Sequence, residues 1–165
     1  MTYSTLDNPV LEFAFECRLM FTRVFAIPDV HNGGFRSAVL VDEGHFEGPR
    51  LRGKAIPNSG GDYAHFRADD TAVFDARYLL EVDDGTIIYM QNKGYLWGRK
   101  PDSMQRLRAW AFEGGPPVAH EDYYLRAQPT FEVSKGKYDW MTRHVFIGVG
   151  ERKPDGNFVR YYALT

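Results

Sequence analysis

The sequence predicts a mainly β protein in which about eight antiparallel strands form a barrel or a sandwich, with one short helix. Three observations support this prediction. Several segments alternate apolar and polar residues with a period of two, which is typical of strands with one packed face. The connections between these segments are short and rich in glycine, proline and aspartate. No regular alternation of helix and strand occurs, which excludes a parallel α/β sheet.

The clearest predicted strand spans residues 11–21. Its polar positions include Glu12, Glu16 and Arg18, so we expect one face to meet water and the other to pack. The residues expected on the packed face are Leu11, Phe13, Phe15, Cys17, Leu19 and Phe21. A loop through Pro28 should follow, and then a second short strand over residues 37–42.

Residues 44–63 contain five glycines and two prolines, with apolar residues spaced between them. This pattern breaks a helix and favours a short strand over residues 49–56 between two sharp corners. At the second corner, residues 59–61 should let the backbone approach a neighbour closely and then present Asp62. An ordinary glycine-rich turn is the alternative interpretation.

A hairpin is predicted where residues 76–82 and 86–91 flank Asp83-Asp84-Gly85, with Gly85 at positive φ. A helix is predicted over residues 101–112. Asp102 or Ser103 can cap that helix, and the Gly-Gly-Pro-Pro sequence after it should end it.

Three strands are expected in the last third of the chain, over residues 123–133, 143–152 and 158–164. In the first of them, Pro129 should mark an edge, a bulge or a bend, because proline has no N–H for the ladder. An eight-stranded barrel of this kind can hold one small ligand in its interior.

Composition restricts the classes of function. A chain of 165 residues has the size of a single domain, covering residues 1–165. A net charge of −2 with both signs interspersed argues against nucleic-acid binding. No apolar run is long enough for a membrane span, and residues 1–9 lack the pattern of a signal peptide. The one cysteine, Cys17, excludes an intrachain disulfide, so we expect a cytoplasmic protein.

Five motifs in order carry a family resemblance. They are Gly44-x-Phe46-Glu47-Gly48-Pro49-x-Leu51-x-Gly53, Gly60-Gly61-Asp62, Asp83-Asp84-Gly85-x-Ile87, Tyr124-x-Arg126-x-x-Pro129-x-Phe131-Glu132, and Trp140 with Phe146-x-Gly148. Over roughly residues 13–162 the chain resembles the uncharacterised family called domain of unknown function 3237. The resemblance implies a calycin-like antiparallel β-barrel with a pocket, and it implies no particular reaction. The chain departs from the family pattern at Tyr63, usually Trp, and at Thr142, usually Asn.

The strand over residues 123–133 carries the main candidates. Tyr124, Arg126, Thr130 and Glu132 share one face, and Leu125, Ala127, Phe131 and Val133 share the other. One interpretation places the polar face in water and the apolar face in the core. In a barrel around a ligand, however, the interior can be partly polar. Because the family motif falls on these residues, we predict that Arg126 and Glu132 point inward.

Six further residues are candidates for binding or catalysis. Asp62 could direct a carboxylate into the barrel mouth, and Arg36 could bind a carboxylate or phenolate oxygen. Tyr89 could offer its hydroxyl inward, and Trp140 could stack on a ligand or plug the barrel. Tyr124 and His144 complete the predicted binding set, and each of the six could instead be structural. The histidine spacing predicts no metal site, and no nucleotide or flavin motif predicts a cofactor.

These candidates favour a cofactor-independent lyase or isomerase that acts on a small aromatic or apolar oxygenated molecule. Dehydration, double-bond migration and cyclisation need only a base, an acid and a cation that stabilises an oxyanion. Glu132 or Asp62 would be the base, with Arg126 as the cation. Two alternatives are a non-catalytic carrier of a similar ligand and a structural or oligomerisation module. A homodimer is also expected, because exposed barrel faces need cover.

Overall fold

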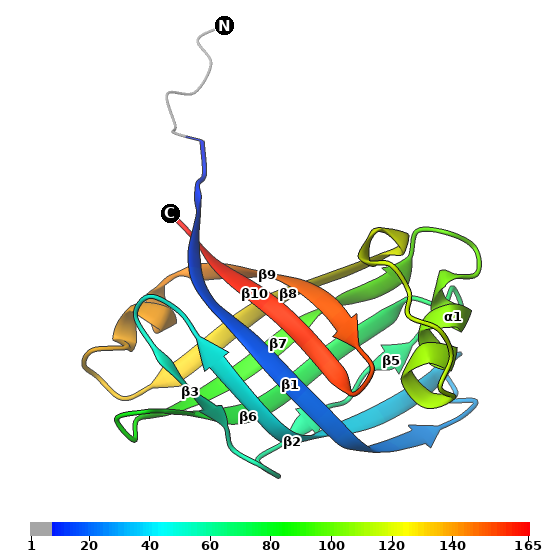
Figure 1. The fold of residues 1–165 in the computed structure, drawn as a ribbon, viewed down its shortest axis with the longest axis horizontal. Coiled ribbons are helices and arrows are strands. Elements are labelled where there is room, and N and C mark those ends of the chain that lie inside the picture. The colour runs from blue at the N-terminus through cyan, green and yellow to red at the C-terminus, as the bar shows by residue number, and fades with distance from the viewer. Residues whose placement is uncertain (1–7) are drawn as a thin grey trace, which may run out of the picture.

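Antiparallel strands that close into a barrel form the body of the computed structural model, which describes residues 8–165 (Figure 1). The strands are β1 (Leu11–Ile27), β2 (Phe35–Glu47), β3 (Arg52–Ala55), β4 (Gly61–Asp62), β5 (His65–Phe66), β6 (Ala72–Val82), β7 (Ile87–Gly98), β8 (Tyr123–Val133), β9 (Val145–Lys153) and β10 (Gly156–Leu164). Residues 1–7, within the stretch considered for a signal peptide, lie outside the described residues.

The sheet closes because β1 pairs with β10 on one edge and with β2 on the other. The short strands β3, β4 and β5 each pair with both β2 and β6, so together they fill one position in the barrel. Counted this way, the barrel has eight positions. This confirms the predicted antiparallel barrel of about eight strands.

Alternation along the strands determines which side chains fill the interior. On β6 every second residue from Ala72 to Val82 is buried, and on β8 the buried positions run from Tyr123 to Phe131. Fully buried rings of Phe15, Phe46 and Phe146 belong to the same core. The inward faces are therefore the apolar ones, as hydrophobic burial requires.

Strand β1 differs from its prediction in two ways. It extends to Ile27, where a loop was expected, and its pairing shifts between Phe13 and Phe15. Ala14 is an extra residue at that bulge and is buried, whereas Leu11 and Phe13 are exposed. The expectation that Leu11 and Phe13 share the buried face of Phe15 is therefore wrong, because a one-residue bulge exchanges the two faces.

Two local predictions are confirmed. Gly85 has φ of 84°, and the hairpin turn is closed by hydrogen bonds from the Gly85 N–H to the Val82 carbonyl and from the Val82 N–H to the Thr86 carbonyl. The helix forms as α1 (Ser103–Phe112). It is the longest helix among the described residues, and none there is long and apolar enough to cross a membrane.

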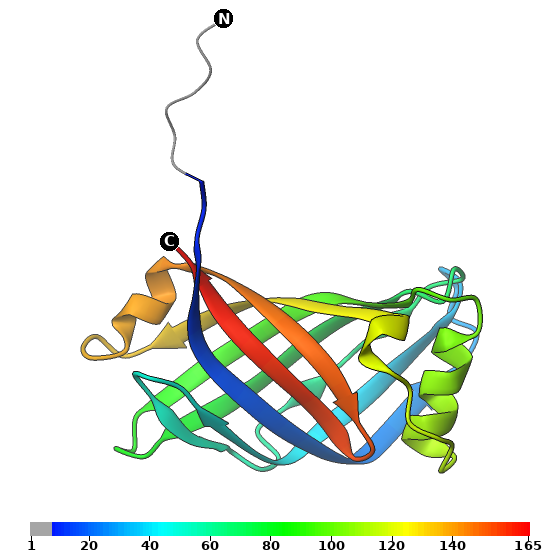
Figure 2. The same cartoon turned by 45° about the horizontal axis from the view of Figure 1, so that its top comes forward.

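The two ends of the barrel are closed differently. Helix α1 lies across one end, near the 3-10 helix η1 (His120–Asp122), and the 3-10 helix η2 (Asp139–Arg143) lies at the other (Figure 2). Edge-to-face contacts join Phe131 to Phe146 and to Phe15, and the Trp140 ring of η2 lies 5.7 Å from Phe146. Aromatic rings therefore fill the half of the barrel next to η2.

Replacing Gly85 with valine should destabilise the protein by ~1 kcal/mol or more, because a β-branched residue at positive φ is strained. No atom lies within 4 Å of a Cβ added there, so the loss would come from the backbone and not from a clash. Chemical denaturation measures the change. An unchanged free energy of unfolding would contradict this explanation.

Phe15→Ala should cost ~3–5 kcal/mol, because it leaves a cavity at a fully buried ring. Phe13→Ala is the matched control two residues away. Phe13 is 38% exposed and its ring meets Tyr162 edge-on, so the loss of the ring should cost clearly less. Equal losses in urea melts of the two variants would mean that the bulge at Ala14 is misplaced.

Candidate functional site

A cavity of about 110 Å³ occupies the half of the barrel covered by α1. Met104, Leu107 and Ala111 of the helix form one wall, and inward residues of the strands form the others. Most of these side chains are apolar. The polar groups that line the cavity are Ser37, Asp62, Tyr78, Asn92, Arg108, Arg152, Asn157 and Tyr161.

Asp62 reaches the cavity because two glycines let β4 fit between β2 and β6. A Cβ atom at Gly60 would lie 1.8 Å from the Arg77 carbonyl oxygen, and one at Gly61 would lie 2.5 Å from that of Val39. Any larger residue would push β4 out of the sheet. The glycine pair therefore has a packing role, and it turns the next side chain into the barrel.

The Asp62 carboxyl is partly buried and lines the cavity. Burial raises its pKa to about 7, because a charge is poorly solvated there. The N–H of Asp75 donates to Asp62 Oδ1 at 3.1 Å and, together with Arg152, opposes that rise, whereas the negative charge of Asp75 adds to it. Near neutral pH this carboxyl can therefore both accept and donate a proton.

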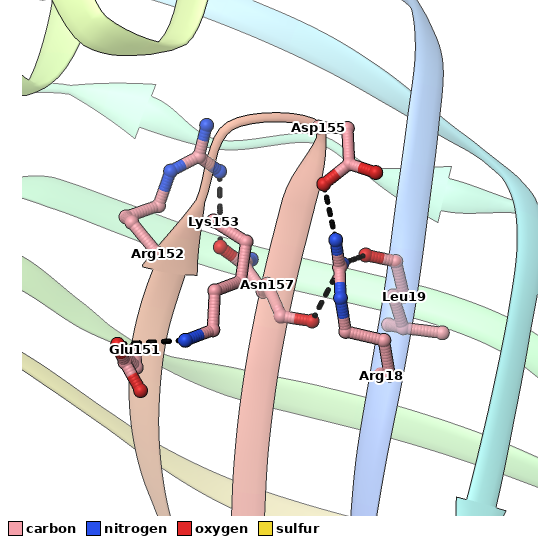
Figure 3. A network of polar contacts seen from close by, with 7 residues as sticks. All are labelled: Arg18, Leu19, Glu151, Arg152, Lys153, Asp155 and Asn157. Atoms are coloured by element: carbon pink, nitrogen blue, oxygen red, sulfur yellow. Dashed lines mark hydrogen bonds and ion pairs between the residues drawn. The ribbon is translucent and has the colours of Figure 1, made fainter. Parts of the chain in front are cut away.

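Arg152 enters the same cavity from β9, where it shares the inward face with Gly148 and Gly150. Its Nη1 donates to Asn157 Oδ1 at 3.0 Å across the β9–β10 hairpin (Figure 3). Burial lowers the pKa of Arg152, and the Asp62 carboxylate partly offsets this. On the far side of the hairpin, Arg18 binds Asp155 and the carbonyl oxygen of Asn157 (Figure 3).

A third set of polar side chains in the cavity consists of Asn92, Tyr78 and Tyr161. Asn92 Nδ2 donates to the Tyr161 hydroxyl at 2.9 Å, and Gly148 leaves room for the Tyr161 ring. Burial raises the pKa of both tyrosine hydroxyls well above the usual range. In strand register, Ala76 lies between Asp62 and Asn92, so a ligand over Ala76 would meet both side chains.

Arg126 and Glu132 lie on the outer surface, so the prediction that they point inward is wrong. On β8 the inward positions are Leu125, Ala127 and Phe131, as the simpler interpretation of the alternation requires. The Arg126 guanidinium instead lies 4.9 Å from the centre of the Tyr124 ring. Neither Arg126 nor Glu132 can act on a molecule inside the barrel.

Two predicted tyrosines are also on the outside. Tyr124 stacks on Trp97 with ring centres 5.3 Å apart. Tyr89 lies opposite Glu132 in the β7–β8 ladder, and its neighbours Ile88 and Met90 are the inward residues. Both hydroxyls are therefore remote from the cavity.

The three remaining candidates do not line the cavity either. Arg36 is exposed and donates to the Tyr63 carbonyl oxygen at 2.8 Å. Trp140 is buried at the η2 end, where the Arg50 guanidinium lies 4.0 Å from the centre of its ring. His144 is exposed, and its Nδ1 lies 2.7 Å from the Trp140 carbonyl oxygen. Of the eight predicted site residues, Asp62 lines the cavity and the other seven do not.

Sequence reasoning missed Arg152, Asn92 and the two tyrosines. A signal was present at a spacing of two, because Asn92 interrupts the apolar inward series of β7 and Arg152 ends the inward series of β9. Asn92 follows Ile88 and Met90 on β7 in this way. A polar residue in an otherwise apolar inward series was the pattern that indicated the site.

The described part of the chain contains no group of three or more histidine, cysteine, aspartate or glutamate residues that could hold a metal ion. Burial raises the pKa of the Cys17 thiol to about 12, so the thiolate needed for nucleophilic chemistry is scarce at neutral pH. The cavity therefore offers acid–base groups and hydrogen-bonding groups.

The chain belongs to the family described as protein of unknown function (DUF3237), whose model matches residues 9–164. A UPF0311 protein of Rhodopseudomonas palustris (strain TIE-1) is 30% identical over 145 residues, which cover 85% of this chain and 90% of that protein.

Two solved structures are similar in fold. One is a beta-barrel like protein from Acinetobacter baumannii AYE, which is 28% identical and has a TM-score of 0.82, with 99% of this chain and 100% of that chain covered. The other is described as an enzyme from Penicillium herquei. It is 21% identical, with a TM-score of 0.71 and coverage of 99% and 100%, and shows the shared fold alone.

The raised pKa of Asp62 makes a prediction about stability. In the folded protein the group holds its proton up to about pH 7, whereas the unfolded chain releases it near pH 4. Stability should therefore fall as pH rises through this window and level off above it. From the low-pH end of this window to the high-pH end, the free energy of unfolding of Asp62→Asn should rise by ~2–4 kcal/mol relative to that of the wild type.

Urea denaturation at several pH values between 4 and 8 measures this difference. Glu132→Gln, which changes an exposed carboxylate, is the control. A constant difference between Asp62→Asn and the wild type across the window would show that the Asp62 carboxyl is ionised throughout.

Proposed function

We propose that this barrel is an acid–base isomerase or lyase that binds a small, largely apolar oxygenated molecule in its cavity. The observation that supports the proposal is that a carboxyl of raised pKa and a partly buried guanidinium line the same largely apolar cavity. Enzymes tune carboxyl groups toward neutral pKa by burial of this kind. The solved barrel described as an enzyme has the same fold.

The proposed step is a proton transfer at carbon. Asp62 removes a proton from a carbon next to a ketone, and the C–H electron pair moves into an enolate. The negative oxygen of the enolate is stabilised by Arg152, whose charge the cavity leaves poorly solvated. Asp62 then returns the proton to the same or to a conjugated carbon, which moves the double bond. If a β-hydroxyl leaves instead, Asp62 gives it the proton and water departs.

The chemistry of the lining favours isomerisation over reactions that need two separate acids. Among the lining residues that the structure describes, Asp62 is the single carboxyl group. The Tyr78 and Tyr161 hydroxyls have pKa values raised by burial, so they suit hydrogen bonding better than proton release. One group would therefore take and return the proton, as double-bond migration allows.

Exchange of hydrogen for deuterium tests this step. In D₂O, 2-tetralone, a small aromatic ketone, should exchange the protons next to its carbonyl faster with the protein than without it. Asp62→Asn keeps the shape and removes the base, so it should lower the exchange rate by ~10²-fold or more. Proton NMR follows the exchange directly.

Glu132→Gln is the matched control, because this carboxylate lies outside the barrel. It should leave the exchange rate unchanged. If 2-tetralone binds, as shown by ligand-observed NMR, but the wild-type protein does not accelerate exchange, the cavity belongs to a carrier and the proposed reaction is wrong. A control variant as slow as Asp62→Asn would also contradict the assignment.

A further inference from the structure

Arg152 carries a partly buried positive charge to which no carboxylate of the described chain is bound in an ion pair. Its one side-chain hydrogen bond within residues 8–165 goes to the neutral Asn157. Ion pairs in that part of the chain join other arginines and lysines to acidic groups, and none includes Arg152. A partly buried guanidinium is poorly solvated without a counter-ion, so an anion from outside the chain would be stabilised there.

The other charges around the cavity do not compensate Arg152. Arg108, at the helix wall, is already paired with Asp70. Asp62 influences Arg152 across the cavity, but it forms no ion pair with it, and below pH 7 it is mostly protonated. Below pH 7 the cavity therefore has a net positive charge in a mostly apolar lining. Such a site favours a ligand with one negative charge.

We propose that the cavity binds its ligand as a monoanion whose negative oxygen lies on the Arg152 guanidinium, so that phenols and enols bind as phenolates and enolates. On binding, the O–H bond of the ligand breaks, the electron pair stays on oxygen, and the proton passes to solvent, because Asp62 already holds its own proton below pH 7. This inference rests on the proposed function in using the same two side chains. It names the substrate class: oxygen acids with an apolar, ring-sized body.

Several charged groups face these two side chains. Asp75 on β6 donates its backbone N–H to Asp62, while its carboxylate binds Arg77 and Gln91 outside the barrel. Tyr123 on β8 and Arg18 on β1 act on Arg152, and the Arg18 charge lowers the pKa of Arg152 further. Because Arg18 is itself bound to Asp155, Arg152 remains the group that is free to meet an anion.

The test uses 4-nitrophenol, whose phenolate is yellow and whose phenol is colourless. It is titrated with an excess of the full-length protein, and the absorbance of the bound form gives its pKa. If Arg152 binds the oxygen, the pKa of bound 4-nitrophenol should lie about one unit or more below that of the free compound. Arg152→Met should remove this shift, and burial should then raise the pKa instead. Arg152→Lys, which keeps the charge, should restore part of the shift.

Arg126→Met is the matched control, because Arg126 is an arginine on the neighbouring strand that faces outward. It should leave the shift intact. A bound 4-nitrophenol with raised pKa in the wild type, or an unchanged shift in a folded Arg152→Met variant, would overturn the inference. A lowered pKa without exchange of 2-tetralone would uphold the anion site and reject catalysis, so the two proposals fail separately.

Discussion

Pairing on both edges of β1 is the constraint on which the rest of the barrel depends. This strand pairs with β10 from Leu11 to Met20 and with β2 from Glu16 to Ile27, so the sheet has no free edge along their shared length. Closure gives the sheet an inner face and an outer face. Because side chains alternate with a period of two, each strand residue then points to one of these faces. The register of its strand therefore determines whether a candidate side chain points into or out of the barrel, and the chemistry of the side chain does not.

That constraint explains which parts of the sequence analysis succeeded. The hairpin at Gly85, the extent of β8 and the helix that became α1 depend on local signals, which are turn chemistry, alternation and helix stops. The error at Arg126 and Glu132 arose because the family motif was given more weight than the apolar face opposite them. Hydrophobic burial decides the orientation of a strand, because turning Leu125, Ala127 and Phe131 into water would cost several kcal/mol.

Other features could not be predicted because they depend on distant pairing. The bulge at Ala14 exchanges the faces of β1 through one unpaired residue, and nothing in the alternation indicates it. Arg152 and Asp62 are ninety residues apart in the chain, and they share a cavity only because the sheet closes. Single polar residues on apolar faces indicate a site, but the partner of each one is determined by the register of eight positions.

Asp62 and Arg152 line one cavity without forming an ion pair, and the proposed function depends on this separation. A direct ion pair between Asp62 and Arg152 would offset the desolvation of both, and apolar residues would remove it altogether. The fold instead gives each group a neutral partner, the Asp75 N–H for Asp62 and the Asn157 amide for Arg152. Neither group then has an opposite charge bound to it, and the proposed anion site depends on this arrangement. A barrel selected for stability alone would have filled this space, as its own aromatic rings do at the other end.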